Sequence, residues 1–240
     1  MKNKIAIFSD IHGNLQALES IIKDIKEKRI DNVYCLGDVI GIGPNPKECL
    51  DLIINNNIKM VLGNHELYFL KGTNIDNSVG NDEKAHHEWI RSQLNKINKD
   101  YLKTCPLIIT DKIEKYTVCF EHFIIKDNSN DIYPFEDLSI INNIKDTLIK
   151  SLNRDITFIG HEHNSFEMNI NNKRIIDVGS SGCTKDDNTF YTLLTFDNDI
   201  IKIEKIKLKY NRKVFENTFN NISYSDKEII GKIFFGINSN

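Results

Sequence analysis

Three short apolar runs near the start of the chain each lead directly into a cluster of polar residues. The clusters are Ser9-Asp10-Ile11-His12, Gly37-Asp38 and Gly63-Asn64-His65-Glu66. Between these runs, leucines and isoleucines recur at helical spacing, from Leu15 to Ile25 and from Pro46 to about Ile54. A unit of strand, loop and helix that repeats in this way predicts a largely parallel sheet with right-handed crossovers.

All three clusters follow predicted strands, and open sheets of this kind bind ligands at the carboxyl ends of their strands. Taken alone, Asp10 and His12 fit an ordinary polar turn. In an extended strand, however, residues two apart project to the same face, so both side chains can reach one point. A carboxylate and an imidazole that converge there suit a borderline transition metal. The repetition after each strand favours a metal site over a polar turn.

Later segments of the chain predict further strands and helices. The segments 107–110, 117–122, 155–160, 166–170, 174–178, 191–196 and 200–208 read as strands, and the last four are expected to form an antiparallel meander in a second sheet. Helices are expected over 83–98, capped by Asp82 and with Ala85, Trp89 and Leu94 toward the core, and over 138–152. Residues 71–81 and 126–131 read as loops, and 211–240 as two short helices, the second capped by Ser225 or Asp226. We expect a single domain over 1–240, with the motifs within 5–163 and further strands and short helices in 164–240.

Charge and cysteine usage exclude several classes of function. A net charge of -3 argues against binding long nucleic acid, and no apolar run approaches the ~20 residues that span a membrane. The five cysteines show no CxxC spacing, which predicts neither a disulfide framework nor a thiolate zinc site. The first residues lack the apolar region of a signal peptide, and the cysteine usage leads us to expect a reducing cytoplasmic location.

The polar residues at the strand ends form a large set of candidate metal ligands. The set is Asp10, His12, Asp38, Asn64, His122, His161 and His163. Seven nitrogen and oxygen donors are too many for one tetrahedral ion, and they suit two ions ~3.5–4 Å apart that share a carboxylate. Asp38 comes from the central cluster and is the natural bridge. Such a pair lowers the pKa of a bound water toward ~7 and creates hydroxide that can attack a phosphate ester. His65 is the candidate acid that protonates the leaving alkoxide, and the alternative is that it only orients Asp10 or a solvent molecule.

The ordered motifs Asp10-x-His12, Gly37-Asp38-x-x-Gly41, Gly63-Asn64-His65-Glu66, a lone His122 and Gly160-His161-x-His163 resemble the calcineurin-like metallophosphoesterase superfamily, most of all its small bacterial stand-alone members. The resemblance implies an α/β four-layer sandwich of two mixed β-sheets flanked by helices, with a dinuclear metal site at the carboxyl ends of the strands. It also implies which residues hold which ion. Asp10, His12 and His163 would hold one ion, Asn64, His122 and His161 would hold the other, Asp38 would bridge them, and His65 would be the acid.

At a few positions the sequence differs from the family pattern, and two of these differences limit the class of substrate that we expect. Ile42 and Leu62 stand where protein serine/threonine phosphatases of the superfamily carry phosphate-gripping arginines, so no guanidinium fork is available. Phe123 stands where many bacterial relatives have a glycine. We therefore expect hydrolysis of a small phosphomonoester, phosphodiester or dinucleoside polyphosphate. The alternatives are a phosphoprotein phosphatase and a catalytically weak metal-binding scaffold, although a scaffold is expected to lose its acid histidine or several ligands.

Several questions stay open at this level. The mixed donors accept Mn, Fe, Co, Ni or Zn, and no pattern indicates the oligomeric state. Asn14 can touch phosphate, but helix capping explains it equally well. Other polar residues near the motifs have structural interpretations: His86 and His87 on a helix surface or packed on Trp89, Glu66 and Glu162 as solvated acids or partners of the imidazoles, and Ser180 and Ser181 in a turn.

Overall fold

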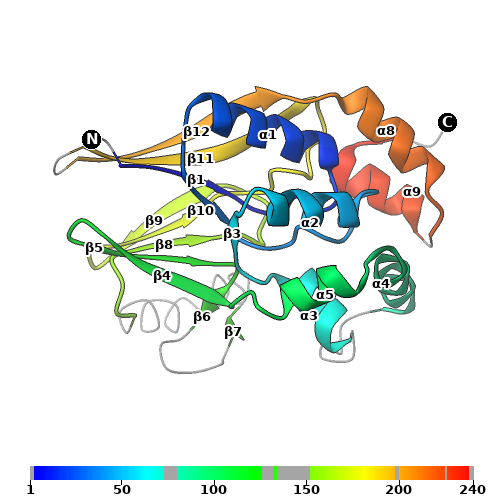
Figure 1. The fold of residues 1–240 in the computed structure, drawn as a ribbon, viewed down its shortest axis with the longest axis horizontal. Coiled ribbons are helices and arrows are strands. Elements are labelled where there is room, and N and C mark those ends of the chain that lie inside the picture. The colour runs from blue at the N-terminus through cyan, green and yellow to red at the C-terminus, as the bar shows by residue number, and fades with distance from the viewer. Residues whose placement is uncertain are drawn as a thin grey trace.

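The computed structural model describes residues 3–72, 80–125, 132–133, 152–197, 200–224 and 226–237. Two mixed five-stranded sheets lie face to face, with helices alongside (Figure 1). The first sheet has the order β12 (Ile200–Lys209), β11 (Asn188–Asp197), β1 (Asn3–Phe8), β2 (Asn32–Cys35) and β3 (Lys59–Met60). The second has the order β4 (Ile108–Ile113), β5 (Tyr116–Glu121), β8 (Ile156–Ile159), β10 (Lys173–Asp177) and β9 (Phe166–Ile170). A two-stranded ribbon of β6 (Ile124–Ile125) and β7 (Ile132–Tyr133) follows β5.

Each sheet contains a parallel set of three strands that carries the predicted motifs. Strands β1, β2 and β3 pair in parallel in the first sheet, and β5, β8 and β10 do so in the second. The predicted meander was wrong for the last two strands, because β11 pairs antiparallel with β1 and β12 with β11 in the first sheet. Strand β11 has apolar side chains on both faces, since Leu193 joins the core under the helices and Leu194 the core between the sheets. It can therefore extend the buried centre of the first sheet.

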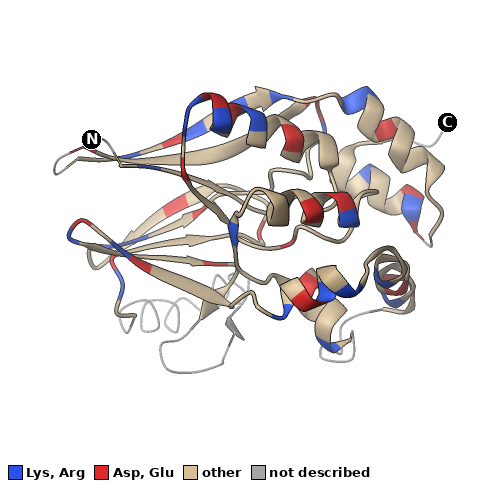
Figure 2. Ribbon diagram, viewed as in Figure 1, with Lys and Arg blue, Asp and Glu red and all other residues tan. Residues whose placement is uncertain are grey.

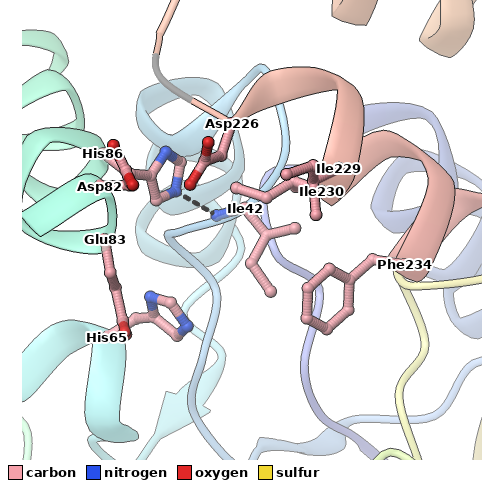
Figure 3. Close-up of a pocket in the computed structure, with 9 residues that line it drawn as sticks. All are labelled: Ile42, His65, Asp82, Glu83, His86, Asp226, Ile229, Ile230 and Phe234. Carbon is pink, nitrogen blue, oxygen red and sulfur yellow. Dashed lines mark hydrogen bonds between the residues drawn. The ribbon is translucent and has the colours of Figure 1, made fainter. Parts of the chain in front are cut away.

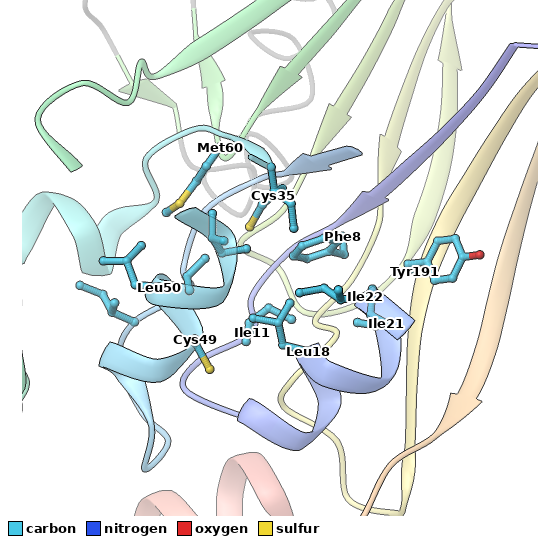
Figure 4. Packing of buried hydrophobic residues seen from close by; sticks show 14 of the residues in the cluster. Phe8, Ile11, Leu18, Ile21, Ile22, Cys35, Cys49, Leu50, Met60 and Tyr191 are labelled. Atoms are coloured by element: carbon cyan, nitrogen blue, oxygen red, sulfur yellow. The ribbon is translucent and has the colours of Figure 1, made fainter. Parts of the chain in front are cut away.

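The alternation of β1 divides the core into two layers. Ile5 and Ile7 point between the sheets and pack in one cluster with Phe120, while Phe8 points to the other face of the first sheet. There it meets the apolar side of α1 (Leu15–Glu27), including Leu18 (Figure 4). The predicted helical spacing in this segment is confirmed, and Figure 2 shows charges of both signs along the rest of the helix.

Other helices line the same side of the first sheet or lie at its end. They are α2 (Pro46–Asn55), α3 (Asn64–Lys71), α4 (Asn81–Gln93), α5 (Lys96–Leu102), α8 (Arg212–Asn221), α9 (Lys227–Ile230) and the π-helical turn η2 (Gly231–Phe235). The single helix predicted over 83–98 is interrupted, because Leu94 is extended and Asn95 caps α5 by accepting a hydrogen bond from the Asn98 amide at 3.0 Å. Ala85 is exposed, contrary to the prediction. Asp226 is the cap residue of α9 but makes no side-chain capping bond.

Some predicted segments lie outside the described residues, namely the helix over 138–152 except Leu152, the loop 126–131 and most of the loop 71–81. Within the described part of the chain, no helix is both long enough and apolar enough to cross a bilayer. The five cysteines are all free thiols, as their spacing predicts, and Cys35 and Cys119 are buried.

Candidate metal centre

The seven predicted ligands come together at the carboxyl ends of the parallel strands. Asp10 and His12 follow β1, Asp38 follows β2, Asn64 begins α3, His122 follows β5, and His161 and His163 follow β8. Four of the seven are buried, namely Asp10, His12, Asp38 and His122. Two sheets that meet at one edge thus collect side chains that are up to 153 positions apart in the chain.

The backbone brings these side chains together by a route that the sequence did not indicate. We predicted that Asp10 and His12 share a face of an extended strand, but β1 ends at Phe8. Five of the ligands instead have left-handed backbones, with φ values of 54° at Asp10, 46° at His12, 49° at Asp38, 77° at His161 and 60° at His163. Each such non-glycine conformation costs on the order of 1–3 kcal/mol and persists only where the surroundings enforce it. Concentrated in one place, it indicates a functional site.

Hydrogen bonds between loops enforce this geometry. The His12 amide donates to the Asp38 carbonyl at 2.9 Å, which ties the loop after β1 to the loop after β2. On the other side, the Gly182 amide and the Ser180 hydroxyl donate to the Asp10 carbonyl at 3.0 and 2.8 Å. A side chain at position 182 would overlap the Ile11 carbonyl, so this approach requires glycine. Ser180 is thus a buried residue of the loop that holds Asp10 in place.

The first group of donors surrounds the side chain of Asp10. The Nε2 atoms of His12 and His163 lie 3.0 Å apart, and Asp10 Oδ1 lies 3.6 and 3.5 Å from them. Asp10 Oδ1 is buried and has no hydrogen-bond partner among the described residues. Cys183 Sγ lies within 4.8 Å of the ligand atoms of both histidines. The sequence gives no local signal for Cys183, because the loop 180–182 brings it to the site.

The second group of donors surrounds Asn64. Its Oδ1 lies 3.2 Å from His122 Nε2 and 3.1 Å from His161 Nδ1. His122 Nδ1 donates to the Leu36 carbonyl at 2.7 Å, which leaves Nε2 to face the site. Asp38 lies between the two groups, since its Oδ2 is 3.3 Å from His122 Nε2 and 3.8 Å from His12 Nε2. This is the position expected of a bridging carboxylate.

The aspartates keep their negative charge despite burial. Burial acts to raise the pKa of Asp10, but the nearby imidazoles of His12 and His163 hold that pKa well below its usual value. The pKa of Asp38 is likewise lowered against the effect of burial, mainly by the charge of His122. Burial acts to lower the pKa of His122, and the Asp38 carboxylate overcomes it and raises this pKa to about 10. Because metals bind the neutral imidazole, metal binding must release protons here.

The donor set fits divalent transition metals. Imidazole, carboxylate and amide oxygen are ligands that Mn, Fe, Co, Ni and Zn accept, and a cation would satisfy the unpaired Asp10 Oδ1. The donors form three overlapping groups, and within each group the ligand atoms lie within 4.8 Å of one another. The groups are His12–His163–Cys183, His12–Asp38–His65, and Asp38–His122–His161. The structure thus brings together every residue that the sequence predicted for metal binding.

His65 lies beside the donors, and His87 and then His86 pack against its other side. Its ring centroid is 5.0 Å from that of His12 and 5.1 Å from that of His87. Burial, together with the nearby His12, lowers the pKa of His65 well below its usual value, and Asp38 opposes this only in part. His86 and His87 are buried, so a place on the helix surface was wrong for both. The alternative prediction is confirmed for His86, which stacks on Trp89.

Glu66 is buried next to the site and binds backbone amides, so it is not a solvated acid. It is fully buried, and its carboxylate accepts hydrogen bonds from four backbone amides, those of Asp38, Val39, Ile40 and Gly63, at 2.8–3.1 Å. No contact with an imidazole is needed to explain it. Glu66 therefore joins the loop after β2 to the start of α3 and fixes the position of Asp38.

Replacing Glu66 by alanine is expected to lower the free energy of unfolding by roughly 3–5 kcal/mol, because four buried N–H groups lose their acceptor. Urea denaturation followed by circular dichroism measures this loss. Glu66→Gln keeps the shape and one acceptor oxygen, and should have an intermediate effect. A loss below about 1 kcal/mol for alanine would contradict the structural role.

Gly41 leaves room for His65. Its φ is +100°, and a Cβ there would overlap the His65 ring at Nδ1. We expect Gly41→Ala to displace His65 and lower kcat by about 10–100-fold while metal binding persists. Gly72→Ala is a matched control, because Gly72 has a φ of +87° and a Cβ at that position would meet no atom within 4 Å. Equal losses of kcat in both variants would attribute the effect to backbone strain alone.

Two further residues complete the surroundings of the site. The Asn14 side chain accepts from the Ala17 amide at 3.1 Å and donates to the Gly182 carbonyl at 2.8 Å, so helix capping and loop attachment account for it. Phe123 is buried, and its ring centroid lies 4.6 and 4.9 Å from those of His122 and His161. The phenylalanine that stands at 123 in place of glycine therefore does not remove His122 from the site.

This fold, with its carboxylate and imidazole donors at the strand ends, defines a metallophosphoesterase. Residues 3–199 match the family model for the calcineurin-like phosphoesterase superfamily domain, and the chain belongs to that family. An uncharacterized protein of Methanocaldococcus jannaschii is 30% identical over 92% of this chain and 94% of its own length. The crystal structure of a metallophosphoesterase from Sphaerobacter thermophilus has the same fold, with a TM-score of 0.74, 21% identity, and coverage of 98% of this chain and 99% of that one. A symmetrical bis(5'-nucleosyl)-tetraphosphatase of Baumannia cicadellinicola is 36% identical over 64 residues, 25% of this chain and 22% of its own.

Proposed function

We propose that the protein is a dinuclear-metal-dependent phosphoesterase that hydrolyses a small phosphate ester. The observation that carries this proposal is the position of Asp38 between two groups of donors, within 3.3 Å of a nitrogen in one and 3.8 Å of a nitrogen in the other. A single structural ion needs no shared carboxylate of this kind. Membership of the calcineurin-like family supports the same reaction class.

The roles of the ligands follow from their grouping. Asp10, His12 and His163 would hold one ion, Asn64, His122 and His161 the other, and Asp38 would contact both. Bound divalent ions supply an activated water and neutralise the charge of phosphate oxygens. The protein itself contributes buried, preorganised side chains that hold the ions and orient the ester.

His65 is the proposed general acid for the leaving oxygen. Its low pKa makes it neutral in the free protein at neutral pH. An anionic phosphate ester brings the opposite charge close to the imidazole, and such a charge favours the protonated form. We therefore infer that His65 gains its proton as the substrate binds and passes it to the leaving group.

The residues around the site favour small esters over phosphoproteins. Ile42 and Leu62 are buried apolar residues, so neither position offers a charged group for a phosphorylated peptide. A dinucleoside polyphosphate is the second candidate, because a short stretch of the chain is similar to a tetraphosphatase. The free cysteines fit the proposed reducing cytoplasm, and the net charge of -3 fits a small substrate better than a long nucleic acid.

Hydrolysis of two chromogenic esters by metal-stripped protein tests the proposal. The esters are para-nitrophenyl phosphate and bis(para-nitrophenyl) phosphate, with Mn, Fe, Co, Ni or Zn restored one at a time. Metal-dependent turnover is the expected result, and the preferred ester narrows the substrate class. Binding of ions without turnover of either ester would favour a scaffold, and the absence of metal binding would contradict the whole proposal.

A further inference from the structure

A cavity of about 280 Å³ opens beside His65 (Figure 3). Four segments of the chain form it: the loop after β2, the start of α3, the first turns of α4, and the C-terminal helices α9 and η2. Its lining consists of Ile42, His65, Asp82, Glu83, His86, Asp226, Ile229, Ile230 and Phe234. We call this cavity the His65 pocket.

The His65 pocket adjoins the candidate metal centre on two sides. His65 belongs both to the pocket wall and to a donor group with His12 and Asp38. Phe234, at the other side of the pocket, packs edge-on against the metal-site residue His163, with ring centroids 5.8 Å apart. A group attached to a phosphate at the metal centre can therefore enter the pocket past the residue that protonates the leaving oxygen.

Two histidines of the pocket lining carry ring nitrogens without a hydrogen-bond partner among the described residues, but these nitrogens lie behind the cavity surface. His86 Nε2 accepts a hydrogen bond from the Ile42 amide at 2.8 Å, so the proton of its neutral ring resides on Nδ1. That Nδ1 is buried and has no partner among the described residues, and the same is true of His65 Nδ1. Both histidines are at least nine-tenths buried. The pocket therefore presents to a ligand mainly its apolar side chains and its carboxylates.

The charged residues that line the pocket are all acidic. Asp82 and Glu83 approach from α4 and Asp226 from the start of α9, and among the described residues no lysine or arginine lines the cavity. The rest of the lining consists of His65, His86, three isoleucines and the Phe234 ring. Carboxylates repel a second phosphate or a carboxylate, and an aromatic face attracts a cation.

We propose that the His65 pocket receives the leaving group of the ester, and that its three carboxylates select an uncharged or cationic alcohol over one that carries further phosphate or carboxylate groups. This inference rests on the proposed phosphoesterase function. It assigns the natural substrate to the esters of a single phosphate with an organic alcohol, and it makes dinucleoside polyphosphates poor substrates, since their leaving group is itself a phosphate.

Three alkyl phosphates that differ mainly in leaving-group charge test the selection. They are choline phosphate, its neutral carbon isostere dimethylbutyl phosphate, and phosphoglycerate, with diadenosine tetraphosphate as a fourth substrate. With the most activating metal bound, we expect kcat/KM for the first two to exceed that for the anionic pair by about tenfold or more. Hydrolysis of either anionic substrate as fast as dimethylbutyl phosphate would overturn the inference.

Charge-neutralising variants separate the pocket from the rest of the surface. In the triple variant Asp82→Asn, Glu83→Gln, Asp226→Asn, the ratio of kcat/KM for phosphoglycerate to that for dimethylbutyl phosphate should rise about tenfold. Glu88→Gln is the matched control, because Glu88 lies on the same helix, is 71% exposed and is not part of the pocket lining. An unchanged ratio in the triple variant, or an equal rise in the control, would overturn the pocket's role. Absence of turnover for every ester with every metal would instead overturn the proposed function itself.

Discussion

Replacing Asp38 by asparagine is expected to weaken the binding of divalent ions and to lower metal-activated kcat/KM by roughly 10³-fold. Asp38 Oδ2 lies within 3.8 Å of a nitrogen from each donor group, and Asp38 Oδ1 accepts from the His65 amide at 3.0 Å. Asparagine keeps the shape but removes the negative charge that two adjacent cations need between them. The loss should therefore come from the charge and not from a collapse of the loop.

Metal content by elemental analysis, ion affinity by calorimetry and kcat/KM for para-nitrophenyl phosphate measure this effect. Asp111→Asn is the matched control, because Asp111 is a partly exposed carboxylate that pairs with Lys59 at 3.1 Å, away from the metal site. The control should bind ions as the wild type does. If the Asp38 variant bound two ions with unchanged affinity and lost less than tenfold in kcat/KM, Asp38 would not be the bridge.

Replacing His65 by alanine is expected to lower kcat by about 10²–10⁴-fold while ion binding remains. The imidazole is buried against His12 and His87 beside the donors, so the substitution removes the proposed proton donor for the leaving oxygen. A general acid matters most when the leaving group is a poor one. The loss should therefore be larger for an alkyl phosphate than for para-nitrophenyl phosphate, whose leaving group needs little protonation.

The same comparison distinguishes an acid from a ligand. His65 forms a donor group with His12 and Asp38 whose ligand atoms lie within 4.8 Å of one another, so a role in metal binding has a geometric basis too. If His65→Ala lowers ion affinity, and both esters lose activity equally, His65 is a metal ligand. If ion affinity is kept and the loss depends on the leaving group, His65 is the acid.

The sequence alone was sufficient for most of the strands, for the family and for seven of the donors, although not for Cys183. Apolar runs such as Val33–Leu36 and the helical spacing of Leu18, Ile21 and Ile25 are local patterns, and local patterns decide which segments form strands and helices. The same patterns predict that the polar residues after those runs lie close together, because in parallel sheets the carboxyl ends of the strands meet at one edge. All seven predicted ligands lie at that edge.

Only the tertiary structure decided how these residues are held and what surrounds them. The left-handed backbones of Asp10 and Asp38, the burial of Glu66 under four amides, and the attachment of the loop at Gly182 all depend on contacts between distant segments. The place of β11 in the first sheet has the same origin, since Leu193 and Leu194 show apolar faces but not which strand they will pair with. The His65 pocket is made by four separate segments, so no local pattern could contain it. Hydrophobic periodicity acts over a few residues and is visible in the sequence, whereas the partner of a buried polar group is chosen by packing across the whole fold.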